Sequence, residues 1–100
     1  MEQTIQPLAS HAATGNMVKL VSGIARSLVD LPEEVFVEAV SSADGTVLRL
    51  QVAQGDVGKV IGKQGRTARS LRTIISAASM KLKHRFSLDI VEEQSSSTVP

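Results

Sequence analysis

The chain of 100 residues contains no cysteine, which excludes disulfides and thiolate metal sites. Its two histidines, His11 and His84, have no Cys or His partner at ligand spacing, so a zinc site is not expected. No apolar run reaches the ~18 residues of a membrane-spanning helix. The N-terminus lacks the basic start and apolar centre of a signal peptide. These absences predict a cytoplasmic protein without metal or cofactor.

Aromatic residues are nearly absent, since Phe36 and Phe86 are the two in the chain. RNA-binding domains that stack bases on exposed rings, such as the RRM, the OB-fold and the cold-shock domain, need more of them. The remaining composition, 42% hydrophobic and 21% charged, is ordinary for one folded domain of this length.

Acidic residues are missing from the whole interval between Asp56 and Asp89. The same interval holds eight of the eleven basic residues: Lys59, Lys63, Arg66, Arg69, Arg72, Lys81, Lys83 and Arg85. The net charge of +1 therefore conceals a basic segment attached to an acidic body. This polarity favours a surface that binds a polyanion, and a solvated cationic helix face explains the charge alone equally well.

Hydrophobic periodicity predicts six elements in the order α-β-β-α-α-β. They are a helix over 16–31 that Asn16 caps and Pro32 ends, strands over 35–40 and 48–52, a short helix over 56–61 with Asp56 as its N-cap, a long helix over 66–83, and a strand over 86–90. We expect an α+β domain over 16–92, in which helices cover one face of a three-stranded sheet. Residues 1–15 are expected to form a flexible arm and residues 93–100 a disordered polar tail.

The long helix is predicted to have a packed face and a basic face. The apolar arc contains Ala68, Leu71, Ile74, Ile75, Ala78 and Leu82. Arg66, Arg69 and Arg72 fall outside this arc. Ala77 and Met80 lie on the polar arc, where they either mark a contact surface or are isolated exposed apolar residues.

A glycine turn, Gly62-Lys63-Gln64-Gly65, joins the short helix to the long one. Glycines at both ends allow unusual backbone angles and close approach of another backbone. The turn also places main-chain amides at the start of the long helix, where an anion is favoured. The spacing fits neither a P-loop nor a dinucleotide fingerprint, and a G-x-x-G by itself is also typical of a plain helix-helix turn.

The stretch V-I-G-K-Q-G between a short and a long helix, within this element order, resembles a type II KH domain. The segments L-V-D-L-P-E-E-V and G-D-V-G-K-V-I-G-K-Q-G-R-T-A-R-S-L-R-T-I-I are similar to the small stand-alone bacterial KH proteins of the KhpA family. The resemblance covers about Asn16 to Glu92. It implies a non-catalytic protein that binds single-stranded RNA.

The resemblance also implies a site and partners. The expected RNA-binding residues are Gly58, Lys59, Val60, Ile61, Gly62, Lys63, Gln64, Gly65, Arg66 and Arg69, although helix packing is an equal explanation for Gly58. Similar proteins act on RNA after transcription or as RNA chaperones. They self-associate or pair with a larger KH-containing RNA-binding protein, in work connected with cell elongation and envelope synthesis.

Two other interpretations remain open from the sequence. A short helix, a glycine turn and a basic helix also fit a helix-turn-helix DNA-binding protein, although the short helix is below two turns. An assembly module with a vestigial KH groove is the second, and the acid-free segment with Lys63 argues against it. An enzyme is not expected, because no nucleophile and base accompany Asp56 and Lys59 near the loop.

Overall fold

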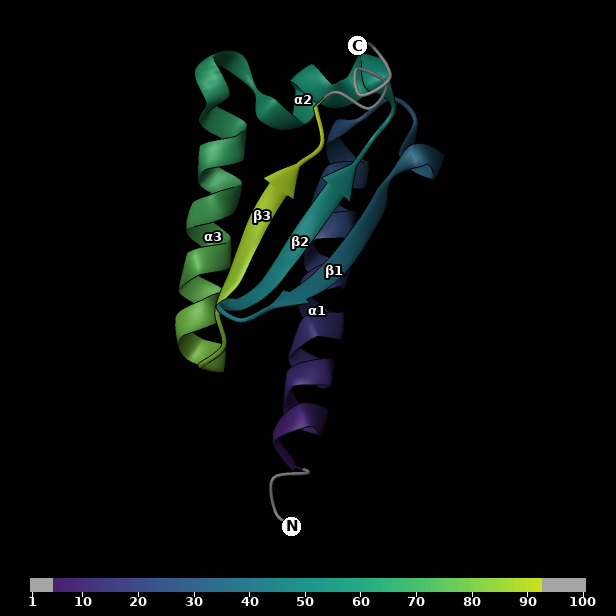
Figure 1. Ribbon diagram of the computed structural model, residues 1–100. Coiled ribbons are helices and arrows are strands. Elements are labelled where there is room, and N and C mark those ends of the chain that lie inside the picture. The colour runs from purple at the N-terminus through teal and green to yellow at the C-terminus, as the bar shows by residue number, and fades with distance from the viewer. Residues whose placement is uncertain (1–4, 93–100) are drawn as a thin grey trace, which may run out of the picture.

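The computed structural model describes residues 5–92, and it has the predicted order of helices and strands (Figure 1). The main elements are α1 (Ile5–Leu28), β1 (Phe36–Ser42), β2 (Gly45–Gln51), α2 (Val57–Ile61), α3 (Arg66–Leu82) and β3 (Phe86–Ile90). Short 3-10 turns precede β1, α2 and α3, at Pro32–Glu34, Gln54–Asp56 and Lys63–Gly65. Within the described residues, no helix is both long and apolar enough to span a membrane.

The helix α1 starts earlier than the sequence predicts, at Ile5 rather than after Asn16. The prediction that Asn16 caps it, and that residues 5–15 belong to a flexible arm, is therefore wrong. Alanine-rich sequence favours helix, and Pro7 lies in the first turn, where its missing N–H costs little. Ala13 is buried, which ties the added turns to the core. Residues 1–4 and the predicted tail at 93–100 lie outside the described part of the chain.

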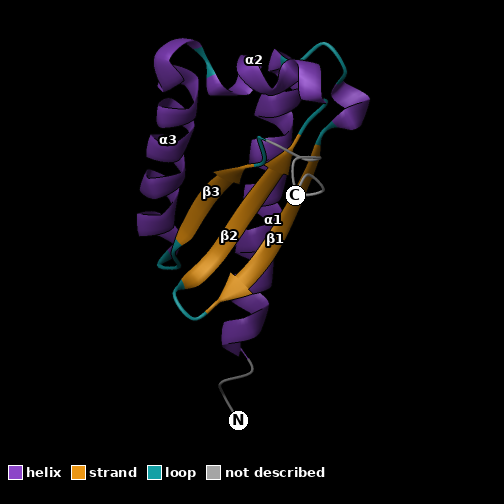
Figure 2. Cartoon of the chain, turned by 45° about the horizontal axis from the view of Figure 1, so that its top comes forward, coloured by secondary structure: helices purple, strands orange, loops and turns teal. Residues whose placement is uncertain are grey.

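The three strands form one sheet in the order β1-β2-β3. β1 and β2 pair antiparallel through the turn at Ala43–Gly45, whereas β3 pairs parallel to β2, with Leu48 opposite Leu88. A parallel neighbour requires a long crossover, and α2 and α3 supply it. β3 is therefore an edge strand, and α3 lies along its outer side (Figures 1 and 2).

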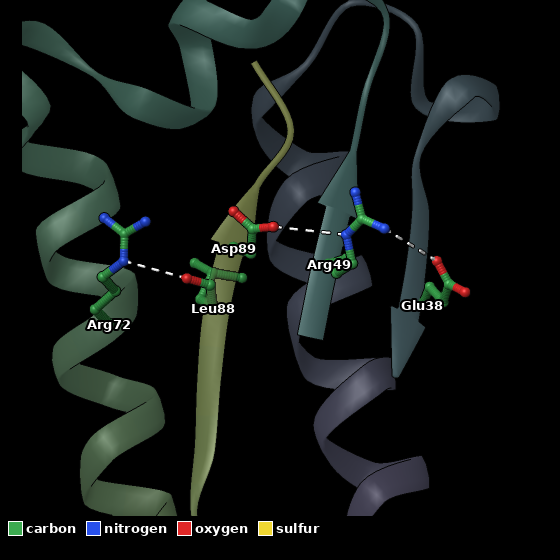
Figure 3. A network of polar contacts seen from close by, with 5 residues as sticks. All are labelled: Glu38, Arg49, Arg72, Leu88 and Asp89. Carbon is green, nitrogen blue, oxygen red and sulfur yellow. Dashed lines mark hydrogen bonds and ion pairs between the residues drawn. The ribbon is translucent and has the colours of Figure 1, made fainter. Parts of the chain in front are cut away.

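Helices cover one face of this sheet, as the sequence predicts. Along β2 and β3 the buried residues alternate strictly, so that one face packs into the core. The core also receives Met17, Val21 and Ala25 of α1 at steps of four. The opposite face is open and carries a row of charges, in which Arg49 contacts Asp89 at 3.5 Å and Glu38 at 3.9 Å (Figure 3).

The core face of α3 is narrower than its sequence suggests. Ala68, Leu71 and Ile75 are buried as predicted. Ile74, however, is 46% exposed, so its assignment to the packed arc is wrong. The buried positions follow steps of three and four along one line of the helix, and Ile74 falls beside that line. The helix thus contacts the sheet through a single stripe and leaves both flanks open.

Candidate nucleic-acid interface

The loop between α2 and α3 has a backbone that depends on its two glycines. Gly62 has φ 81° and Gly65 has φ 74°, both in the left-handed region. A Cβ on Gly62 would stand 2.2 Å from the Thr67 hydroxyl, so a side chain there also has no room. Gln64 adopts φ 57° between them. The chain therefore makes a tight turn at the start of α3, in which Lys63 and Gln64 are exposed and the two glycines are half-buried.

The side chains of this loop point into solvent. Lys63, Gln64 and Arg66 are exposed, and Arg66 donates a hydrogen bond from Nη2 to Gln64 Oε1 at 3.1 Å. Among the described residues, no carboxylate forms an ion pair with Lys63 or Arg66. The two cations are therefore available to an external anion beside the exposed backbone.

The four predicted site residues on the short helix α2 differ in how exposed they are. Gly58 is exposed, and an added Cβ would meet nothing within 4 Å, so packing inside this chain does not require glycine there. Ile61 is half-buried beside the loop. Val60 has 0% exposure and belongs to the core, which removes it from the surface that a ligand can touch.

Lys59 is engaged by two carboxylates rather than free. Its Nζ lies 3.4 Å from Asp30 Oδ2 and 3.5 Å from Asp56 Oδ1. The ion pair with Asp30, followed by the effect of Asp56, outweighs partial desolvation and raises the pKa of Lys59 above 10.5. Lys59 therefore links α2 to the end of α1, and its charge is largely compensated within the molecule.

Asp56 anchors this end of the domain. The sequence predicts an N-cap, but its carboxylate forms no capping hydrogen bond to α2. It is 3% exposed and accepts a hydrogen bond at 3.0 Å from the backbone N–H of Leu31, in the segment that follows α1. Desolvation raises the pKa of Asp56, but hydrogen bonds from the Leu31 and Asp30 backbone, together with Lys59, lower it below 3.8 overall. Asp56 thus holds α2, and the glycine loop after it, against α1.

This anchor predicts an acid-sensitive contribution to stability. Because the pKa of Asp56 is lower in the folded than in the unfolded state, its ionised form stabilises the fold above about pH 4. That contribution disappears as the pH falls through the folded-state pKa. We expect Asp56→Asn to unfold at lower urea concentration than wild type at pH 7, and the difference to shrink as the pH falls below about 4. Urea unfolding at a series of pH values measures both curves.

The exposed Asp44, in the turn between β1 and β2, provides a matched control for that experiment. Asp44→Asn removes the same charge, and its curve should follow wild type over the whole range. If the urea midpoints of Asp56→Asn and wild type differ by the same amount at every pH, the ionised form of Asp56 is not what stabilises the fold.

A groove of about 560 Å³ lies beside α3, farther along the helix than the loop, and Arg72 is its lining residue nearest to the loop in sequence. Its walls are the exposed flank of α3, the outer edge of β3 and the turn that joins them. The described residues that line it include no acidic side chain; they are Arg72, Ile75, Ser76, Ser79, Met80, Lys83, His84, Arg85, Phe86, Ser87 and Leu88. Among these residues, Arg72 stands at one end of the groove, and Lys83 and Arg85 stand at the other.

Two side chains fix the groove walls to one another. The Ser79 hydroxyl donates to Ile75 O at 2.8 Å and accepts from the backbone N–H of Phe86 at 3.0 Å. Arg72 Nε donates to Leu88 O at 3.4 Å (Figure 3). At the far end, Thr46 Oγ1 and His84 Nε2 lie 2.9 Å apart. These contacts hold α3 beside the edge of the parallel strand.

The loop is visible in the sequence, whereas this groove was not predicted from it. Ser76, Ser79, His84 and Arg85 were not expected at the site, and they meet there because β3 returns parallel to β2. Met80, one of two apolar residues that the sequence places on the polar arc, also lines the groove. A usable signal was the recurrence of the polar residues Arg72, Ser76, Ser79 and Lys83 at steps of three and four along one flank of the helix.

The arrangement removes the structural basis for a helix-turn-helix protein. α2 has five residues, and α3 packs one face on a mixed sheet while its opposite flank borders the groove. The geometry instead offers an exposed main-chain turn, free cations and a long concave surface with apolar and polar walls.

Comparison with known proteins identifies a family. Residues 18–90 match the family described as KhpA/KhpB, KH domain. The chain is 48% identical over 75 residues to "RNA-binding protein KhpA" of Clostridium acetobutylicum, which covers 75% of this chain and all of that protein. It is 41% identical over 78 residues to "RNA-binding protein KhpA" of Borreliella burgdorferi, covering 78% of this chain and 95% of the relative.

A crystal structure of Aquifex aeolicus Era is similar to 74% of this chain and 29% of its own, with a TM-score of 0.49 and 15% identity. The family match over residues 18–90 and the observed element order establish the type II KH fold predicted from the sequence. Both relatives are named RNA-binding proteins, and the matched family is described as a KH domain. This chain therefore belongs to the KhpA/KhpB family of KH domains.

Proposed function

We propose that this protein binds single-stranded RNA without catalysing a reaction on it. The observation that supports this function best is the groove along the edge of β3, whose described lining residues include no acidic side chain and which lies on the same helix, α3, that the glycine turn begins. A single strand presents both phosphates and unpaired bases. The cations of the loop suit the phosphates, and the groove with apolar and polar walls suits the bases. Membership of a family whose relatives are named RNA-binding proteins supports the same conclusion.

Phosphates are proposed to bind at the loop. The backbone of Gly62 and Gly65 allows a sugar-phosphate chain to approach closely, and Lys63 and Arg66 supply positive charge without an internal partner carboxylate. Gln64 offers an amide beside them. This is the clamp expected for about four nucleotides.

Bases are proposed to lie in the groove beyond the loop. The exposed Gly58 and the half-buried Ile61 lie on α2, on the other side of the loop, and Arg69 stands on the exposed side of α3 one turn after Arg66. Val60 supports this surface from the core, and Lys59 supports it through its carboxylate partners. The few aromatic residues predict modest affinity, because stacking contributes little.

Salt dependence tests this proposal directly. If three or four phosphates are neutralised, the logarithm of affinity should fall with the logarithm of salt concentration with a slope of about −2 to −3. Arg66→Ala/Arg69→Ala should weaken RNA binding and reduce the magnitude of the slope by ~0.7 for each lost contact. Its stability should change by only a few tenths of a kcal/mol per site, since both side chains are exposed.

Fluorescence anisotropy with a single-stranded RNA provides these slopes, and a DNA duplex of the same sequence serves as the control ligand. A slope near zero, or tighter binding to the duplex, would contradict the proposed function. A large drop in melting temperature of the double variant with unchanged RNA affinity would show that the two arginines are structural.

The cellular role is proposed from the family. A single small groove gives weak binding, and linking two such sites raises the overall affinity without new contacts. We propose a cytoplasmic RNA chaperone or post-transcriptional regulator that acts as a homodimer or with a larger KH-containing protein, in control of cell elongation and envelope synthesis. Light scattering of the purified chain and identification of proteins that co-purify with it test the partners; a monomer without KH-containing partners would contradict them.

A further inference from the structure

Arg72 occupies a distinctive place in the groove. It projects from α3 toward the outer edge of β3, where its Nε donates to the main-chain oxygen of Leu88 at 3.4 Å (Figure 3). The hydrogen bond fixes the plane of the guanidinium relative to the strand. The charged end of Arg72 is therefore oriented by the protein before any ligand arrives.

The terminal nitrogens of Arg72 have no partner in the described part of the chain. Its guanidinium carries five N–H donors, and the bond to Leu88 uses the one on Nε. No ion pair among the described residues includes Arg72, and no described residue lining the groove is acidic. The two terminal nitrogens are thus available to a ligand lying between α3 and β3.

We propose that Arg72 is a specificity-determining residue, which selects a base with two adjacent hydrogen-bond acceptors at one position of the bound strand. The inference rests on the proposed single-stranded RNA function and extends it to base selection. Guanine offers such a pair at O6 and N7, and cytosine offers one at O2 and N3. Adenine and uracil place a donor beside each acceptor, so neither satisfies both terminal nitrogens of Arg72.

The position of Arg72 favours a base rather than a phosphate as its ligand. The exposed loop, with Lys63 and Arg66, provides the surface where a backbone can approach closely. Arg72 instead lines the groove beside Ile75 and Leu88, whose apolar atoms suit the face of a base. An oriented guanidinium next to apolar walls is the arrangement that planar, bidentate recognition requires.

Wild type, Arg72→Gln and Arg72→Lys are each used to select RNA from a randomised pool of short single strands. The selected RNAs are sequenced, and their affinity for each protein is measured. Wild type should enrich guanine or cytosine at one position, by about fivefold to 100-fold over uracil. The enriched base decides which acceptor pair is used. Arg72→Gln should shift that position toward adenine, since an amide pairs with N6 and N7. Arg72→Lys keeps the charge but should lose the preference.

Arg69→Gln is the matched control, because Arg69 lies nearly one turn earlier on α3 and does not line the groove. It should weaken all RNAs alike and leave the selected base unchanged. If Arg72→Gln also weakens all RNAs alike and lowers the salt slope, Arg72 contacts phosphate and the inference is wrong. If the Arg72 variants melt at lower temperature but keep the wild-type base preference, Arg72 only stabilises the packing of α3 against β3, and the inference is again wrong. Wild type that binds no single strand would instead refute the proposed function itself.

Discussion

Replacing Lys63 and Gln64 with aspartate is expected to reduce affinity for single-stranded RNA by roughly tenfold or more while the protein stays folded. The change removes one cation and places two carboxylates where the proposed phosphates lie, so attraction becomes repulsion. Both side chains are exposed. Aspartate also tolerates the left-handed backbone that Gln64 adopts at φ 57°. Anisotropy titration and thermal melting of the same sample measure the two properties.

A control must separate a local effect from the change of net charge. Asn16→Asp/Lys19→Asp makes the same change in charge on the exposed side of α1, away from the groove. It should retain most of the wild-type affinity. Equal losses in the two variants would mean that overall charge governs binding, and unchanged affinity in the folded loop variant would remove the loop from the site.

Much of the fold could be predicted because the elements have strong local signals. The alternation in β2 and β3 and the stepped apolar residues of α3 follow directly from burial on one face. The start of α1 could not be predicted in this way. Its first turns are rich in alanine and polar residues, and only the contact of Ala13 with the folded core reveals that they belong to the helix.

The local features of the candidate site are visible in the sequence, whereas the features that depend on tertiary contacts are not. The glycine turn and the acid-free segment are visible in the sequence. The ion pair of Lys59, predicted as an RNA contact, could not be predicted, because its partner Asp30 follows α1 and only the packing of α2 brings the two together. The groove between α3 and β3 could not be predicted either, because it depends on the parallel pairing of β2 and β3, which places the edge of β3 beside Arg72.

Two adjacent isoleucines in α3 provide the sharpest test of how this helix packs. Ile75 is 2% exposed, contributes to the core and lines the groove, so Ile75→Ala should destabilise the protein by roughly 2–5 kcal/mol. For a domain of this size, such a loss lowers the melting temperature by roughly 10 °C or more. The reason is that truncation removes buried apolar contacts and leaves a cavity between α3 and the sheet.

Ile74→Ala makes the identical chemical change one residue away, on a side chain that is 46% exposed. Its cost should stay below about 1 kcal/mol, because little apolar area returns to water and no closed cavity forms. Urea unfolding of both variants gives the two free energies. If the two costs are similar, α3 is rotated relative to the sheet. The groove flank that contains Arg72 and Ser76 would then face elsewhere, and the proposed path of the bases along β3 would have to be abandoned.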